Sequence, residues 1–204
     1  AYCRASRSFE RTFRHLLSLM KRHQLAFVDL ETTALDPFVG EVIEIGVVIA
    51  DQVALPDGRP SLSFVSEHLI ALTPTHLETA DPKSLEICRY HERDWTHAVP
   101  PRAGLDTLAT LLSGKVFVGQ NVAFDWGYLL HAGEAHGVAF DSLVHYHKLD
   151  LASMAFGKLY TEEQLFRFSL REMAEYFGVE NKAAHTALSD AQTTFEVCKR
   201  LLER

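Results

Sequence analysis

The sequence contains little of what marks a disulfide-stabilised, zinc-binding or membrane-spanning protein. Its 204 residues include only three cysteines, Cys3, Cys88 and Cys198, which are far apart and in no ligand spacing. This odd, dispersed set argues against a disulfide framework or a zinc knuckle and favours a reducing compartment. No apolar run reaches the roughly 18 residues of a membrane span, because VIEIGVVIA is short and contains Glu44. The basic start lacks the layout of a secretory signal, so we expect a cytoplasmic protein without a membrane partner.

Positive charge is also scarce. The chain has 20 lysines and arginines against 27 aspartates and glutamates, a formal net charge of −7. This balance argues against a protein that coats nucleic acid through a global positive field. It remains compatible with a nuclease, because a carboxylate metal centre is acidic until its cations bind. A length of 204 residues and a hydrophobic fraction of 47% indicate one well-buried domain.

Repeats, low-complexity tracts and linkers are lacking too, which indicates a single domain. The apolar patterns predict that this domain is α/β, with a mixed sheet of about five strands flanked by helices. The predicted strands are 25–32, 41–52, 61–72 and 115–120, and residues 145–153 are expected to form a fifth strand that runs into a helix. The other predicted helices are 102–112, 121–133, 169–179 and 185–203. Residues 73–101 are expected to be irregular. An amphipathic helix over 6–22 is expected to form an N-terminal extension, residues 1–24, before the domain at 25–204. Its apolar face packs on the domain or docks onto a partner.

Five residues stand in patterns that would bring them to one centre, namely Asp29, Glu31, Asp125, His185 and Asp190. Asp29 and Glu31 are two apart on a strand and project to one face, while Leu30 faces the core. Asp125 begins a helix that follows a strand, which delivers it to the edge of the sheet. Carboxylate oxygens without thiolates suit Mg²⁺ or Mn²⁺, and a histidine beside them is a candidate general base.

Each of these patterns has an ordinary structural interpretation when it is taken alone. Asp29 and Glu31 also fit an acidic strand face, and Asp125 also fits a favourable interaction with a helix dipole. Asn121 is a candidate helix N-cap. The pair His145 and His147 has the spacing of a strand face, but it lacks a third close metal ligand.

Taken together, the segments VDLETTALD, GQNVAFD and HTALSDA resemble the three motifs of the DnaQ-like exonucleases of the DEDDh type, which include proofreading subunits of bacterial DNA polymerases. The resemblance implies a ribonuclease H-like fold and a 3′–5′ exonuclease that releases nucleoside 5′-monophosphates. It also implies two divalent cations, Mg²⁺ or Mn²⁺, held by Asp29, Glu31, Asp125 and Asp190, with His185 as the general base. The sequence departs from the family pattern at Ala34 and Gln120, where glycine and histidine are usual.

The same resemblance implies how the substrate is held. Thr32, Thr33 and Leu35 would line the pocket of the terminal nucleotide, with Asn121 and His185 beside them. The expected partner is nucleic acid with a free 3′ end, DNA rather than RNA, and a polymerase subunit is a further candidate partner. Trimming of RNA or of short oligonucleotides is the alternative activity, and a non-catalytic nucleic-acid or polymerase-binding module is the alternative class.

Residues outside the motifs are further candidates for contact with nucleic acid. The aromatic residues Tyr90, His91 and Trp95 either stack on bases or anchor their own segment. The candidate phosphate contacts are Arg89, Arg93, Lys148, Lys158 and Arg167.

Overall fold

A five-stranded mixed sheet forms the centre of the molecule, in a computed structural model that describes residues 23–181 and 185–204. The strand order is β3-β2-β1-β4-β5. Strands β1, β2 and β3 pair antiparallel, whereas β1, β4 and β5 pair parallel. The bounds are β1 (Leu25–Thr32), β2 (Val42–Ala54), β3 (Pro60–Ala71), β4 (Val116–Gly119) and β5 (Lys148–Asp150). This arrangement confirms the α/β fold predicted from the sequence.

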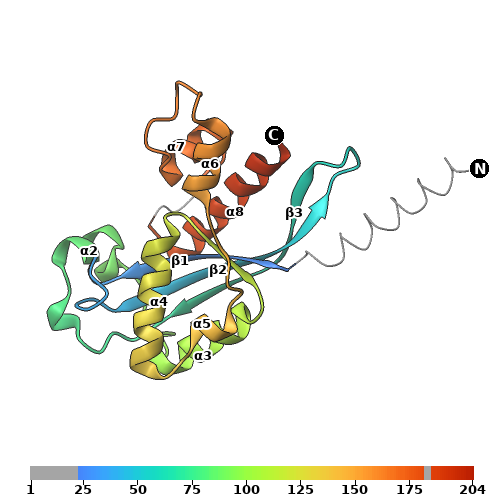
Figure 1. Cartoon of the computed structure of the whole chain (residues 1–204). Helices are drawn as coiled ribbons and strands as arrows, with labels where there is room; N and C mark the ends of the chain where they lie inside the picture. Colours follow the sequence, from blue (N-terminus) through green and yellow to red (C-terminus); the bar gives the residue numbers. More distant parts are fainter. Residues whose placement is uncertain (1–22, 182–184) are drawn as a thin grey trace, which may run out of the picture.

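Two layers of helices cover the sheet, one on each face (Figure 1). One layer consists of α3 (Pro101–Leu112), α4 (Val122–His136) and α5 (Phe140–Leu143). The other consists of α6 (Leu151–Leu159), α7 (Leu170–Phe177) and α8 (Ala187–Glu203). The connection from β3 to α3 contains three short elements, η1 (Leu77–Thr79), α2 (Pro82–Ile87) and η2 (Tyr90–Glu92).

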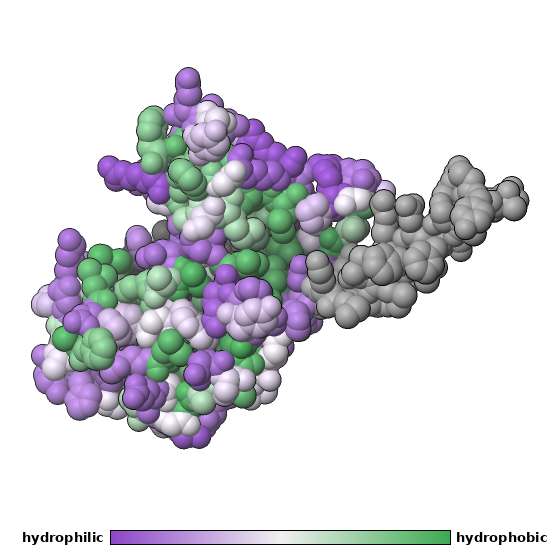
Figure 2. Space-filling model, viewed as in Figure 1, coloured by the Kyte–Doolittle hydropathy of each residue, from purple (hydrophilic) through white to green (hydrophobic). Residues whose placement is uncertain are grey.

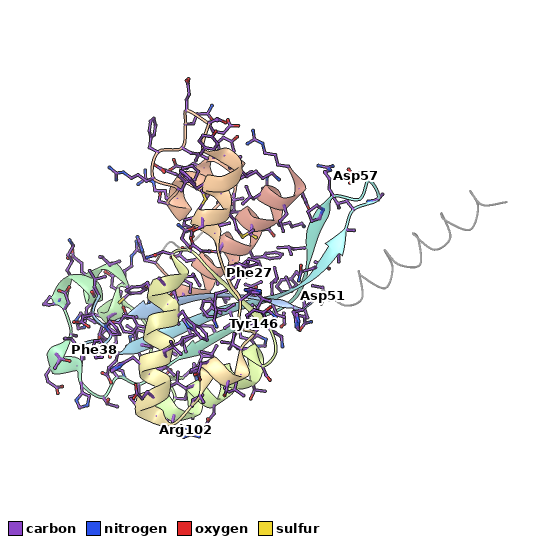
Figure 3. The ribbon with its side chains drawn as sticks, viewed as in Figure 1. Phe27, Phe38, Asp51, Asp57, Arg102 and Tyr146 are labelled. Atoms are coloured by element: carbon purple, nitrogen blue, oxygen red, sulfur yellow. The ribbon has the colours of Figure 1, made fainter. Side chains whose placement is uncertain are left out.

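Strand β1 sends alternate side chains into these two layers, as a strand must. Ala26, Val28 and Leu30 are buried with the residues of α3 and α4. Phe27, near the centre of Figure 3, is buried with residues of α8 and contacts the Phe195 ring edge-on at a centroid distance of 5.5 Å. The same alternation directs the side chains at positions 29 and 31 to the α8 side of the sheet.

The start of α8 lies directly against the backbone of β2. A Cβ atom added to Gly46 would lie 2.1 Å from the carbonyl oxygen of Ala187, so a glycine is needed at this contact. Gly46 is also the register partner of Asp29 on β1. The contact therefore brings the first turn of α8 over the metal-ligand candidates of β1.

Several boundaries differ from the sequence prediction. Helix α8 begins at Ala187, and His185 precedes it with a left-handed backbone at φ 66°. Helix α4 continues past Gly133 to His136, and Gly137, at φ 72°, ends it. Gly133 lies inside the helix and packs closely against the carbonyl of Val138. Residues 73–101 are less irregular than expected, since they contain the short elements given above.

The predicted N-terminal helix, residues 6–22, lies outside the described residues. Within residues 23–181 and 185–204, no helix combines the length and the apolar character that crossing a membrane requires.

Candidate metal centre

Three carboxylates that are far apart in the sequence meet at the end of β1. Asp29, Glu31 and Asp190 each offer an oxygen, and the three oxygens lie within 4.8 Å of one another. Asp29 and Glu31 share the α8 face of β1, and Asp190 lies in the first turn of α8. On the side toward which β1 runs, Figure 2 shows a hollow in the surface between the α6–α7 region and the region of α2 and α4. The geometry suits a cation that takes oxygen ligands.

Asp125 lies beside this group but not within it. Its side chain is buried, and its Oδ1 accepts a hydrogen bond from the backbone N–H of Leu30 at 3.1 Å. Leu30 stands between the two carboxylates of β1, so this bond ties the start of α4 to that strand. Asp125 is thus placed to reach the same centre from the opposite side of β1.

Burial dominates the electrostatics of this centre. It raises the pKa of Asp29 well above its usual value, and the nearby charges of Asp125, Asp190, Glu31 and Glu44 raise it further. Burial also raises the pKa of Glu31 to about 7, although the Arg93 charge lowers it in part. Burial raises the pKa of Asp125 to about 7, against the lowering effect of the hydrogen bond from Leu30. Such a cluster of repelling carboxylates is stabilised by a bound cation.

The carboxylate of Asp190 is fixed by two hydrogen bonds. Its Oδ2 accepts from the backbone N–H of His185 at 3.0 Å, and its Oδ1 accepts from Asn181 Nδ2 at 2.7 Å. His185 is exposed, and its backbone is joined to Asp190 although five residues separate them. The structure thus places His185 next to the metal-ligand candidates.

The loop after β1 uses its threonine hydroxyls internally. Thr32 Oγ1 donates to the carbonyl oxygen of Ala34 at 2.7 Å, and Thr33 Oγ1 accepts from the N–H of Glu41 at 2.8 Å. Tyr128 also donates its hydroxyl to the Ala34 carbonyl. Leu35 is 77% exposed, so a substrate can contact its side chain, and Phe38 of the same loop is exposed as well.

Asn121 occupies the N-cap position of α4, but its side chain makes no capping bond. Asp150 caps the helix instead, because its Oδ1 accepts from the N–H of Val122 at 3.2 Å. Its Oδ2 accepts from the N–H of Ser153 at 2.9 Å and so caps α6 as well. The Asn121 side chain is exposed, with the residue at φ 61°.

The aromatic residues outside the motifs pack against one another. Tyr90 and Trp95 stack with a centroid distance of 4.8 Å, and Trp95 Nε1 donates to the Tyr90 carbonyl at 2.7 Å. This supports an anchoring role for them over base stacking. Two of the basic candidates are also engaged, because Lys158 Nζ donates to the carbonyl of Leu201 at 2.7 Å and Lys148 Nζ lies 4.0 Å from the Trp126 ring centroid.

Sequence reasoning missed Glu44 as part of this region. It is buried on β2 as the register partner of Glu31, and it pairs with Arg93. A signal was present, since Glu44 is the one charged residue within the apolar run VIEIGVVIA. Arg93 was predicted as a phosphate contact, but its guanidinium lies 2.7 Å from Glu44 Oε1.

A mostly apolar cavity of about 460 Å³ lies beside the loop after β1. Its lining includes Phe38, Tyr128 and His131, whereas none of the five predicted catalytic residues reaches it. The cavity is therefore separate from the carboxylate cluster.

Comparison with known proteins identifies the type of domain. The profile of the RNase T family, described as an exonuclease, matches residues 26–198. No curated protein sequence matches the chain significantly.

Solved structures share the fold at low sequence identity. Escherichia coli exonuclease I in complex with a dT13 oligonucleotide is 16% identical, with a TM-score of 0.71, over 88% of this chain and 41% of that chain. The zinc-bound form of the E. coli exonuclease I complex with single-stranded DNA is also 16% identical, with a TM-score of 0.72, over 87% of this chain and 40% of that one. The present chain thus spans less than half the length of these proteins.

Proposed function

Because the chain belongs to the RNase T family of exonucleases, we propose that it is a metal-dependent exonuclease that removes nucleotides from the 3′ end of single-stranded or frayed DNA. The observation that supports this most is the meeting of Asp29, Glu31 and Asp190 at the end of β1. Asp125 and His185 lie beside them. A non-catalytic module of this fold would be expected to have lost some of these groups, and this chain has kept all five.

The side chains present fit a pair of divalent cations. The donor set consists of carboxylate oxygens, which Mg²⁺ and Mn²⁺ prefer. Burial, followed by the neighbouring negative charges, raises the pKa of Asp29, and burial raises the pKa of Glu31, so bound cations would stabilise both carboxylates. Asp29, Glu31 and Asp190 would hold one ion, and Asp29 with Asp125 would hold the second. When bound, such ions lower the pKa of water and stabilise the charge that develops on the leaving oxygen.

The chain's own residues supply the remaining functions. His185 would take the proton from the attacking water, as a histidine near neutral pH is suited to do. Asp190 accepts the backbone N–H of His185, which places the base next to a metal ligand. Leu35, which is exposed at the end of β1, would contact the terminal base, with Asn121 facing the same nucleotide.

The preference for DNA rests on the similar structures, since E. coli exonuclease I is seen there with dT13 and with single-stranded DNA. RNA stays an alternative substrate. The polymerase partner expected from the N-terminal segment has no support from the described residues or from these structures.

The test uses single-stranded DNA and RNA of matched sequence, labelled at the 5′ end, with Mg²⁺ or Mn²⁺. A ladder that shortens from the 3′ end, with release of nucleoside 5′-monophosphates, is the expected result, and EDTA should abolish it. A 3′-phosphate on the substrate should slow the first step. Internal cuts, or release from the 5′ end, would overturn the proposal. Faster shortening of RNA than of DNA would show that RNA is the preferred substrate.

A further inference from the structure

Two residues outside the three motifs, Arg93 and Glu44, hold the backbone of His185 and of Ala187 at the start of α8. Arg93 Nη1 lies 2.7 Å from Glu44 Oε1, and these side chains are only 15% and 8% exposed. The contact does not have the angles of a hydrogen bond, so it is held by charge. The other terminal nitrogen of Arg93, Nη2, donates to the carbonyl oxygen of His185.

The second oxygen of Glu44 holds the start of α8. Glu44 Oε2 accepts from the N–H of Ala187 at 2.8 Å, and Thr186, the N-cap residue, makes no capping bond with its side chain. Glu44 therefore satisfies a backbone donor that the helix itself leaves open. One buried carboxylate thus joins β2, Arg93 and the first turn of α8.

The backbone of His185 is held at both its N–H and its carbonyl oxygen. Its N–H bonds to Asp190 and its carbonyl accepts from Arg93, while its φ of 66° is a conformation that residues other than glycine rarely adopt. Such a backbone persists where the surrounding structure fixes it. The contacts of Arg93 and Asp190 supply that constraint.

We infer that Arg93, supported by Glu44, is a positioning residue that fixes the backbone of His185 and so places the general base. This inference rests on the proposed function, because it assigns His185 the role of base. The alternative, a phosphate contact by Arg93, fits less well, because its two terminal nitrogens already face protein acceptors and its side chain is largely buried.

The first test compares Arg93→Ala and Arg93→Lys with wild type. Both variants should lower kcat about 10- to 100-fold, as expected for a misplaced catalytic group. KM and Mn²⁺ affinity should stay within about threefold, since neither substrate nor metal contacts are removed. Arg93→Lys keeps the charge opposite Glu44, so it should remain folded even where Arg93→Ala does not. Arg171→Ala is the matched control, because Arg171 forms an exposed pair with Glu175 and should leave kcat unchanged.

The second test introduces both Arg93 variants into His185→Ala protein and measures single-turnover rates. Arg93 acts through His185, so its replacement should then cost less than about threefold. A loss of the same size in both backgrounds would overturn the inference, as would a rise in KM with kcat retained, which would identify a phosphate contact.

A third measurement does not depend on activity. In metal-free protein, Arg93→Lys and Glu44→Gln should speed hydrogen exchange of the amides over residues 185–190, whereas Arg171→Ala should not. Unchanged exchange in both variants would overturn the inference even if the enzyme is active. Failure of the proposed function looks different, because wild-type protein would then release no nucleotides while the exchange difference would persist.

Discussion

The two ends of the central sheet each gather side chains of the types that can bind metals, but only one end brings them together as a candidate metal site among the described residues. At the end where β1 stops, carboxylates from β1 and α8 meet, with Asp125 of α4 beside them. Near the start of β5, His23, His145, Tyr146 and His147 form a chain of ring contacts with centroid distances of 4.0 to 5.5 Å. In Figure 3, Tyr146 lies well away from Phe38, which follows β1.

Burial and charge explain the difference. At the carboxylate end, burial raises the pKa of Asp29, and the neighbouring negative charges raise it further. The histidines, by contrast, are exposed or half-buried. Among the described residues, the group that can hold a metal is Asp29, Glu31 and Asp190, and the histidine group does not qualify. Metal-binding side chains that are close together in the sequence are therefore a weaker sign of a metal site than such side chains brought together from distant positions.

The largest expected effect follows from Asp29→Asn. This change would remove a charge that the proposed function assigns to both cations, and metal ions supply several kcal/mol of stabilisation to the transition state. Since about 1.36 kcal/mol is tenfold, the rate of nucleotide release should fall about a thousandfold or more. Asp51→Asn, on the exposed part of β2, should stay within about twofold. Release at the wild-type rate by Asp29→Asn would refute the metal assignment.

His185→Ala should lower kcat by about 10² to 10⁴, the usual contribution of a general base. Mn²⁺ affinity, measured by calorimetry, should change less than about threefold, because His185 is not a predicted ligand. If cation binding collapsed together with the rate, His185 would be a ligand and the two ends of the sheet would differ less than described.

Gly46→Ala tests how tightly the frame of the site is packed. The added Cβ would meet the Ala187 carbonyl at 2.1 Å. The free energy of unfolding, measured in urea, should therefore fall by about 2 kcal/mol, within the usual range of overpacking changes. Gly157→Ala is the matched control, since Gly157 lies within α6 with no atom within 4 Å of an added Cβ. It should raise stability by about 0.5–1 kcal/mol. Equal stability of the two variants would contradict the contact between β2 and α8.

The pKa shifts predict a dependence of stability on pH in metal-free protein. The pKa of Glu31 rises from 4.5 in a free chain to about 7 in the fold, so between these values the folded state binds more protons than the unfolded state. Stability therefore falls as pH rises through this window, by roughly 1–3 kcal/mol for this residue. The difference between wild type and Glu31→Gln, measured by urea unfolding from pH 4 to 8, isolates the effect. Mg²⁺ should restore more stability at pH 8 than at pH 5, and a flat difference would show that Glu31 carries no such shift.

The smallest effect is expected at the histidine end. His145→Ala combined with His147→Ala should change nucleotide release less than about twofold and leave the number of bound Mn²⁺ ions unchanged. Loss of a bound ion in this double variant would reveal a metal site there and would remove the contrast between the two ends.

Much of the fold and the outline of the site could be predicted from the sequence. Asp29, Glu31 and Asp125 lie in a regular strand and a regular helix, where strand and helix geometry fixes the direction of each side chain. The contacts of Arg93 could not be predicted, because it comes from a segment without periodicity and reaches a residue 92 positions away. The capping of α4 could not be predicted either, because Asp150 supplies the cap from the end of β5.

The register that places Asp29 opposite Gly46 has a practical consequence for preparing the protein. A shift of one residue along β1 would turn Asp29 and Glu31 into the apolar layer and leave Leu30 facing α8. A misfolded chain of that kind would bind no cation and would release no nucleotides. The specific activity of a refolded sample should therefore report the fraction of molecules whose first two strands have paired in the correct register. Circular dichroism would not distinguish the two populations, because their strand content is the same.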